Sequence, residues 1–207
     1  MVRYGMVIDL KRCVGCYSCQ IGCRQPNFTP RGTFWARVLK GELGQFPSVT
    51  RGNLPVLCMH CKEPPCKEVC PTGATQKKDN GIVFVDSNLC IGCKACSQAC
   101  PYGARFYVEK WQNYYPGQPL NQYEEYAKAQ WDARHKPGTN TKCEFCSERL
   151  EDGLQPACVD VCPTNARVFG DLDDPQSEVS LLIKTRHGFQ LNPELGTDPS
   201  VYYLPSR

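Results

Sequence analysis

Short apolar runs alternate with groups of cysteines along the chain, and none of the runs is long. Two runs that open on glycine, GMVID (5–9) and GIVFV (81–85), have the length and β-branched content of short strands. Three stretches, each directly after a cysteine group, predict returning strands: ATQKK (74–78), ARFYV (104–108) and ARVFG (166–170). The pattern predicts a small α+β fold in which hairpins and short helices pack on whatever the cysteines bind.

The aliphatic content is too low for an ordinary apolar core. Leu, Ile, Val and Phe make up about a fifth of the 207 residues, which is close to the composition of disordered chains. Sixteen residues are cysteine. We therefore expect bound metal or disulfides to supply much of the stability that apolar burial cannot.

No segment of the sequence predicts insertion into a membrane or export by the chain's own signal. No apolar run approaches the roughly 18 residues of a membrane span. The opening MVRYGMVIDL has neither the apolar region of a signal peptide nor a twin-arginine pair. We expect a chain that stays inside the cell or is exported folded beside a partner.

The cysteines fall into four groups of four with regular spacing. The first group (13–23) reads CxxCxxCxxxC, the second (58–70) CxxCx4CxxxCP, the third (90–100) CxxCxxCxxxCP and the fourth (143–162) CxxCx11CxxxCP. The CxxCxxCxxxCP run is the [4Fe–4S] signature of bacterial ferredoxins. The first group departs from it because Arg24 stands where the others have proline.

Zinc and disulfides are the two competing interpretations of these groups. Structural zinc uses four ligands, usually as two separated pairs, and does not account for the three-cysteine turns. A disulfide framework predicts irregular spacing and a secretion signal, and the sequence has neither. Iron–sulfur clusters are therefore favoured, with a zinc-stabilised binding module kept as an alternative.

The groups are related in pairs, which indicates an internal duplication. The first and third groups each follow an apolar run and an Asp four residues before the first cysteine, while the second and fourth share P-x-C-x-x-V-C-P-T-x-A. The second and third groups are close in sequence and predict one ferredoxin module, about residues 54–108. The first and fourth then pair as an interleaved module, residues 1–30 plus 140–170.

A rule from bacterial ferredoxins sorts the ligands, because there the fourth cysteine of a group ligates the other cluster of the pair. We expect this fourth cysteine to start or sit on a helix that follows the cluster loop. The predicted ligand sets are Cys13, Cys16, Cys19 and Cys162 (cluster one), Cys23, Cys143, Cys146 and Cys158 (cluster two), Cys58, Cys61, Cys66 and Cys100 (cluster three), and Cys70, Cys90, Cys93 and Cys96 (cluster four).

Two segments lie outside the predicted modules. Residues 109–141 form an aromatic-rich insertion with a short helix expected at 123–131, and it is either a partner interface or a flap over the clusters. Residues 171–207 carry turn signals and predict an extended C-terminal arm. His60, inside the second group, is interpreted as a loop residue because all four ligand positions of that cluster are already assigned.

The sequence contains no motif for substrate chemistry, so no catalytic residue is assigned. It has no GxGxxG, P-loop or HExxH motif. The formal charge of +3 counts every cysteine as neutral, whereas each thiolate-ligated cluster carries about −2; nucleic-acid binding therefore loses its support. We expect a chain that moves electrons between two partners, with a self-contained iron–sulfur reductase as the alternative.

The four groups, in this order, resemble the iron–sulfur subunits of the DMSO reductase (complex iron–sulfur molybdoenzyme) family, above all those of polysulfide and arsenate respiratory reductases. The resemblance is carried by YGMVIDLKRCVGCYSC, CMHCKEPPCKEVCPTGA, CIGCKACSQACPYGARF and CVDVCPTNARVFGDLDDPQSEV. It implies four [4Fe–4S] clusters and a large catalytic partner with a molybdenum or tungsten bis-pterin guanine dinucleotide. It also implies relay to a quinol-reactive membrane anchor or a cytochrome, with co-export to the extracytoplasmic face.

Overall fold

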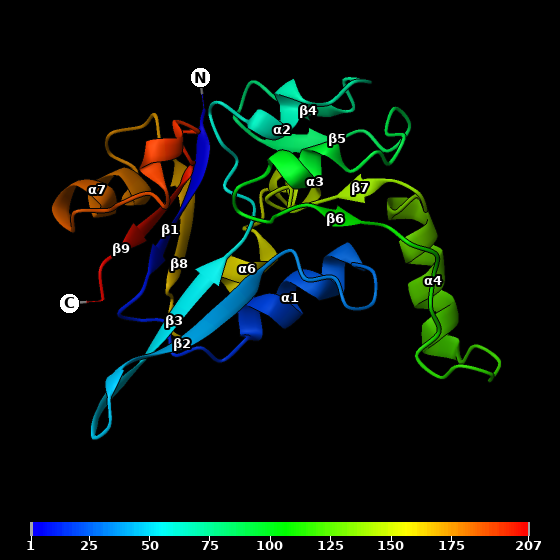
Figure 1. Ribbon diagram of the computed structural model, residues 1–207, viewed down its shortest axis with the longest axis horizontal. Helices are drawn as coiled ribbons and strands as arrows, with labels where there is room; N and C mark the ends of the chain where they lie inside the picture. The colour runs from blue at the N-terminus through cyan, green and yellow to red at the C-terminus, as the bar shows by residue number, and fades with distance from the viewer. Residues whose placement is uncertain (1, 207) are drawn as a thin grey trace.

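The computed structural model describes residues 2–206 and consists of short elements grouped in four small sheets (Figure 1). The strands are β1 (Tyr4–Asp9), β2 (Arg37–Gln45), β3 (Ser48–Val56), β4 (Thr75–Lys77), β5 (Val83–Val85), β6 (Phe106–Tyr107), β7 (Asn140–Thr141), β8 (Arg167–Asp171) and β9 (Val201–Leu204). The helices are α1 (Ser18–Asn27), α2 (Pro65–Glu68), α3 (Ala95–Ala99), α4 (Gln122–Arg134), α5 (Ser147–Glu151), α6 (Ala157–Asp160) and α7 (Glu178–Thr185), with a 3-10 turn at Pro193–Leu195. The predicted α+β character is confirmed.

The expected strands pair so that distant cysteine groups come together. β1, which precedes the first group, is antiparallel to β8, which follows the fourth. β4, after the second group, is antiparallel to β5, before the third. Helices follow the same pairing, because α1 packs against α6 and α2 packs against α3.

The helices correct our expectation for the fourth cysteine in three of the four groups, the exception being Cys23 of the first group. It is the third cysteine that lies near a helix N-terminus, at the second helical residue in every group: Cys19, Cys66, Cys96 and Cys158. Proline disfavours helical geometry in the residue before it, so the helix stops before Cys70, Cys100 and Cys162. With Arg24 in place of that proline, α1 continues through Cys23 to Asn27.

The C-terminal segment is not the extended arm that the sequence predicted. Helix α7 begins at an N-cap, Ser177, whose side chain accepts a hydrogen bond from Ser180 N, and packs on β8, β1 and β9. β9 then lies parallel to β1 and completes a sheet of order β8-β1-β9. Residues 201–204 become a strand because they pair with the free edge of β1. This is a tertiary effect that the local turn signals do not reveal.

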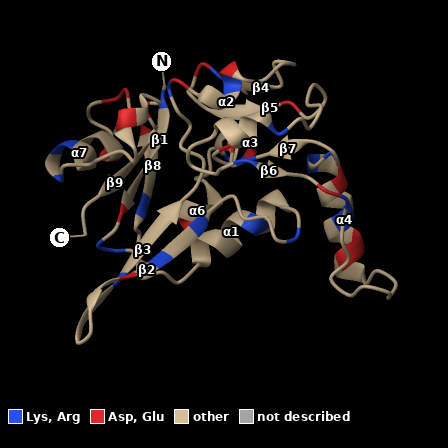
Figure 2. Cartoon of the chain, viewed as in Figure 1, with Lys and Arg blue, Asp and Glu red and all other residues tan. Residues whose placement is uncertain are grey.

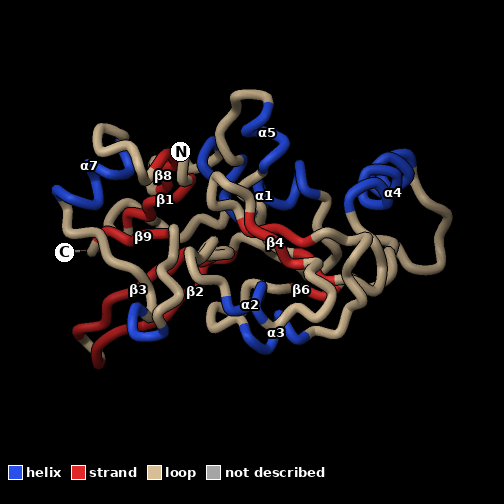
Figure 3. The backbone as a smooth tube through the Cα atoms, turned by 90° about the horizontal axis from the view of Figure 1, so that it is seen from above, coloured by secondary structure: helices blue, strands red, loops and turns tan. Residues whose placement is uncertain are grey.

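Two elements project from the body that holds the cysteines. The β2–β3 hairpin extends at the lower left of Figure 1 and carries exposed Leu43 and Phe46 near its tip. Helix α4 includes the predicted 123–131 and is longer at both ends. It lies at the opposite end of the molecule from α7 in two perpendicular views (Figures 1 and 3).

The insertion contacts the cysteine-bearing body through the C-terminal end of α4 and also through the segment before this helix, where Arg24 donates to the hydroxyl of Tyr114. Trp131 is buried at the C-terminal end of the helix, and the ring of His135 is hydrogen-bonded to the carbonyl of Asn27 over 2.9 Å. Tyr123 and Tyr126, in the N-terminal half of the helix, are exposed.

No helix among residues 2–206 is long and apolar enough to span a membrane.

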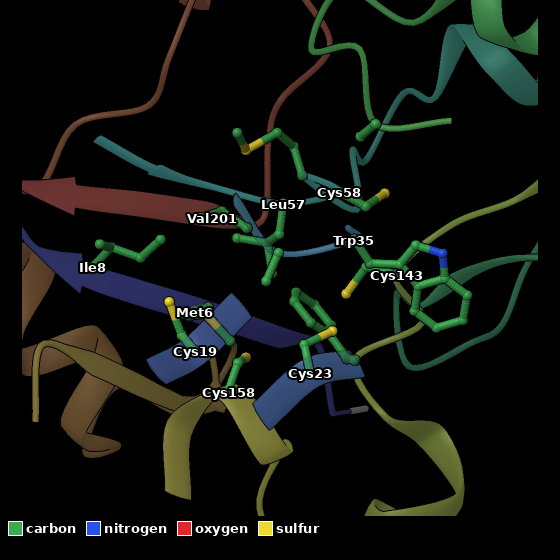
Figure 4. Packing of buried hydrophobic residues seen from close by; sticks show 14 of the residues in the cluster. Met6, Ile8, Cys19, Cys23, Trp35, Leu57, Cys58, Cys143, Cys158 and Val201 are labelled. Atoms are coloured by element: carbon green, nitrogen blue, oxygen red, sulfur yellow. The ribbon is translucent and has the colours of Figure 1, made fainter. Parts of the chain in front are cut away.

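Cysteines make up a large part of the main core. Figure 4 shows Cys19, Cys23 and Cys158 beside Met6 and Leu57, and all of these side chains are buried. Ordinary apolar packing is therefore continuous with the sulfur sites. Loss of order at those sites is expected to disturb the core directly.

The role of β9 in the core can be tested at Tyr203. Its ring is fully buried and its hydroxyl donates to the carbonyl of Pro55 over 2.8 Å. Tyr203→Ala should lower the free energy of unfolding by about 3–5 kcal/mol, whereas Tyr203→Phe should cost about 1 kcal/mol for the hydrogen bond. The measurement is anaerobic denaturant unfolding followed by near-ultraviolet circular dichroism. Exposed Tyr123→Ala is the control, and equal destabilisation by both alanine variants would contradict the structure.

Candidate iron–sulfur centres

All sixteen cysteines are free thiols, so no disulfide crosslinks this fold. Within residues 2–206, no three or more His, Cys, Asp or Glu side chains gather closely enough to hold a single metal ion. The sulfurs instead gather in several neighbourhoods. In two of them, three cysteines of one group line a cavity together with a fourth cysteine from another group.

Two of these neighbourhoods are closed around small cavities. One cavity is lined by the cysteines predicted for cluster one: Cys13, Cys16, Cys19 and Cys162. The other is lined by those predicted for cluster three: Cys58, Cys61, Cys66 and Cys100. Four thiols facing one enclosed space form the donor set that a [4Fe–4S] cubane takes.

The cysteines predicted for cluster two gather at the packing of α1 on α6. Burial raises the pKa of the Cys23 thiol, and the neighbouring thiolates of Cys158 and Cys146 raise it further. Burial likewise raises the pKa of Cys143, with the charges of Cys23 and Cys158 adding to the effect. The four side chains are thus close enough to influence one another electrostatically.

Three of the four cysteines predicted for cluster four, Cys70, Cys90 and Cys96, are also neighbours, and this site is more open. Burial raises the pKa of Cys96; Arg105 opposes the rise, and the thiolates of Cys90 and Cys70 add to it. Cys93 is exposed, as is Cys16 in the first group. Backbone N–H groups also reach these sulfurs: the N–H of Thr75 donates to Cys70 Sγ over 3.5 Å.

The cluster loops of the first and third groups share one backbone design. Cys13 N donates to the carbonyl of Asp9, and Cys90 N donates to that of Asp86, both over 3.1 Å. The glycine in each CxGC turn has positive φ. A Cβ on Gly15 would lie 2.4 Å from Asn53 Oδ1, and one on Gly92 would lie 2.0 Å from a backbone oxygen, so both turns require glycine.

The comparison with known proteins agrees with this geometry. Residues 50–115 and 118–172 match the family model of the 4Fe-4S dicluster domain. The chain is 41% identical to the arsenate respiratory reductase iron-sulfur subunit ArrB of Shewanella sp. (strain ANA-3), over 99% of this chain and 97% of that protein. It is 42% identical to a sulfite dehydrogenase subunit of Allochromatium vinosum, over 100% of this chain and 85% of that protein.

A third relative, a tetrathionate reductase subunit of Salmonella typhimurium, is 42% identical over 98% of this chain and 72% of that protein. The chain belongs to the family of iron–sulfur subunits of molybdoenzyme reductases. The resemblance seen in the cysteine segments is thereby confirmed. As an iron–sulfur subunit it transfers electrons, and catalysis belongs to a partner chain.

Three buried cations of this iron–sulfur subunit were missed by sequence reasoning: Arg105, Lys142 and Arg167. The two arginines each stand five residues after the fourth cysteine of their group, in ARF and ARVF. Comparison of the third group with the fourth would have found them. Lys142 has no such repeated context. Lys and Arg are otherwise distributed over most elements and do not gather on one of them (Figure 2).

His60 lies at the meeting of the second and fourth groups of the iron–sulfur subunit. Its Nδ1 accepts a hydrogen bond from Val83 N over 3.1 Å, and its ring stacks on Phe145 with centroids 3.7 Å apart. Burial, together with the charges of Lys142 and Arg105, holds the pKa of His60 well below its ordinary value. His60 is therefore a neutral packing residue in this structure.

Removal of iron should unfold the iron–sulfur subunit, because the cysteines form much of its core. We expect an anaerobic sample stripped with a chelator to lose its near-ultraviolet circular dichroism along with its visible absorption. The control is a sample that has been exposed to the same chelator but still shows its visible absorption, which separates the effect of the chelator from the effect of iron loss. A stripped protein with a native near-ultraviolet spectrum would show that apolar packing alone maintains the fold.

Proposed function

We propose that the chain carries four [4Fe–4S] clusters and relays electrons between a molybdenum or tungsten bis-pterin catalytic subunit and a membrane anchor or cytochrome. The observation that carries the proposal is the convergence of distant cysteine groups, as where Cys162 joins Cys13, Cys16 and Cys19 around one cavity. Each cluster would accept and release one electron. The names of the relatives, which are reductase and dehydrogenase subunits, support this assignment.

We assign the ligands as the sequence predicted, in two ferredoxin modules spanning residues 1–30 plus 140–170 and residues 54–108. Cluster one would take Cys13, Cys16, Cys19 and Cys162, and cluster two Cys23, Cys143, Cys146 and Cys158. Cluster three would take Cys58, Cys61, Cys66 and Cys100, and cluster four Cys70, Cys90, Cys93 and Cys96. Thiols are the appropriate donors, and four of them fit each cluster.

Electrostatic influences between cysteines of neighbouring sets support a series of clusters in the order one, two, three, four. Cys158 of the second set lies close enough to Cys19 of the first for the Cys19 thiolate to contribute to its raised pKa, after burial and Cys146. The charge of Cys58 in the third set likewise helps to raise the pKa of Cys143 in the second set. The charge of Cys66 in the third set helps to raise the pKa of Cys96 in the fourth. Electron tunnelling falls steeply with distance, so this order supports transfer in three short steps.

The two ends of this series are the exposed ones. Val14 beside Cys16 is 63% exposed, and Ile91 beside Cys93 is 67% exposed. Cys143 and Cys158, in the interior, are buried. We infer that one partner docks at each end, where apolar side chains surround an accessible cluster, and that the assembled complex lies on the extracytoplasmic face of a membrane.

The experiment that tests the function is anaerobic purification from the native host, followed by metal, sulfide and mass analysis. We expect about sixteen iron atoms and as many sulfides per chain, and a much larger partner that contains molybdenum or tungsten. Zinc with almost no iron would instead establish the zinc-stabilised binding module. Turnover of a small substrate by the isolated chain would establish a self-contained reductase.

Ligand sharing between groups can be tested with serine variants. Cys100→Ser should perturb the same electron paramagnetic resonance component as Cys61→Ser, although Cys100 belongs to the third group in sequence. Cys93→Ser, in that same sequence group, should perturb a different component. The spectra are recorded on reduced holoprotein and compared with its iron content. A Cys100→Ser spectrum that matches Cys93→Ser would contradict the proposed sharing.

A further inference from the structure

We propose that Arg167, Lys142 and Arg105 are electrostatic spacers, each lying between two successive clusters and stabilising the reduced state of both. Arg167 would act between clusters one and two, Lys142 between two and three, and Arg105 between three and four. The inference rests on the proposed four-cluster arrangement. It assigns the control of cluster potentials to three specific charges.

Arg167 lies between the first two ligand sets and is 3% exposed. It lines the cavity formed by the cysteines of cluster one. Its Nη1 lies 3.8 Å from Cys158 Sγ, which belongs to the set for cluster two. Its Nη2 is buried and has no hydrogen-bond partner within residues 2–206. A buried guanidinium donor without a protein acceptor is suited to an anionic group that the protein holds at that place.

Arg105, five residues after Cys100, is the buried arginine of the other module and is 7% exposed. Its Nη2 donates to Cys66 Sγ of cluster three over 2.7 Å, and its Nη1 donates to Thr75 Oγ1 over 3.3 Å. Thr75 N in turn donates to Cys70 Sγ of cluster four. The guanidinium therefore touches one ligand set directly and is one residue away from the next.

Lys142 joins the two modules and is fully buried. Its ammonium group donates to the carbonyls of Cys143 and Val83. Cys143 belongs to the set for cluster two, and Val83 lines the cavity of cluster three. Lys142 thus lies between the sites proposed for clusters two and three, whereas Arg167 and Arg105 lie between the other neighbouring pairs.

None of the three cations forms an ion pair with a carboxylate within residues 2–206. The nearest carboxylate in electrostatic terms is that of Glu144, where burial raises the pKa and the charge of Lys142 opposes the rise. A buried charge without a counter-ion is strongly unfavourable. Thiolate-ligated clusters of charge about −2 supply the missing negative charge. This complementarity indicates that the cations are arranged for the clusters rather than for the protein alone.

The effect on electron transfer follows from charge. One-electron reduction adds one negative charge to a cluster, and a nearby cation stabilises that state and raises the midpoint potential. Inside the protein the interaction is screened less than in water, yet it still falls with distance. A cation between two clusters therefore raises both flanking potentials and leaves the distant ones largely unchanged. It also offsets the repulsion between two reduced neighbours.

The test removes one charge at a time: Arg167→Gln, Lys142→Met and Arg105→Gln. Midpoint potentials of the holoprotein are measured by anaerobic redox titration with electron paramagnetic resonance detection. Each variant should lower two of the four potentials. The pairs lowered by the two arginine variants should have no member in common, and the Lys142→Met pair should share one member with each. This pattern does not depend on knowing which potential belongs to which cluster.

Matched controls separate charge from packing. The variants Arg167→Lys, Lys142→Arg and Arg105→Lys keep the charge. Their midpoint potentials should lie nearer to those of the unaltered protein than the potentials of the neutral variants do. Lys184→Gln removes an exposed charge from α7 and should leave all four potentials unchanged. Iron content is determined for every variant before titration.

Unchanged potentials in neutral variants with full iron content would overturn the inference, as would an equal shift of all four. Loss of iron from the neutral variants alone would also overturn it, since the charges would then serve cluster assembly rather than potential. Fewer than four clusters in the unaltered protein would instead refute the proposed function. The two failures are therefore distinguishable.

Discussion

The convergence of cysteines from distant parts of the chain on shared sites is the constraint on which the rest of this structure depends. Cys162 reaches the cavity of Cys13, Cys16 and Cys19 only because β8 pairs with β1 across almost the full length of the sequence. With so little aliphatic material, each sheet is small and cannot hold the fold alone. The sulfur sites then act as the centres around which hairpins and one-turn helices are packed.

The same constraint determines the electrostatics. Sixteen thiols within one small fold would repel one another once ionised, and burial adds to the cost, as the raised pKa of Cys23 illustrates. The thiolates beside Arg105 and Arg167 have the reciprocal effect: although burial lowers the pKa of each arginine, the surrounding cysteines outweigh it. Cations and sulfurs in the interior are therefore mutually dependent, and neither set is favourable without the other.

Sequence reasoning reached the elements whose signals are local. The run at 5–9 lies in β1, the run at 81–85 contains β5 (Val83–Val85), and the duplication correctly related the turns at Gly15 and Gly92. The ends of α2, α3 and α6 were also encoded in the sequence, because a proline follows the fourth cysteine in these three groups. β9 was not predictable in this way, since its four residues become a strand only against the edge of β1. Lys142 was hidden for a similar reason: its burial arises where the two modules meet.

The similarity of this chain to its relatives does not single out one substrate. Relatives named for arsenate, sulfite and tetrathionate are 41%, 42% and 42% identical to it, so overall similarity does not follow the compound in those names. The cysteine framework of this chain is what an electron relay requires, whatever the final acceptor or donor. Differences between such complexes must then act through the partner's site and through the potentials of the clusters. Within this chain, the cluster potentials depend on the few charges buried beside the sulfurs.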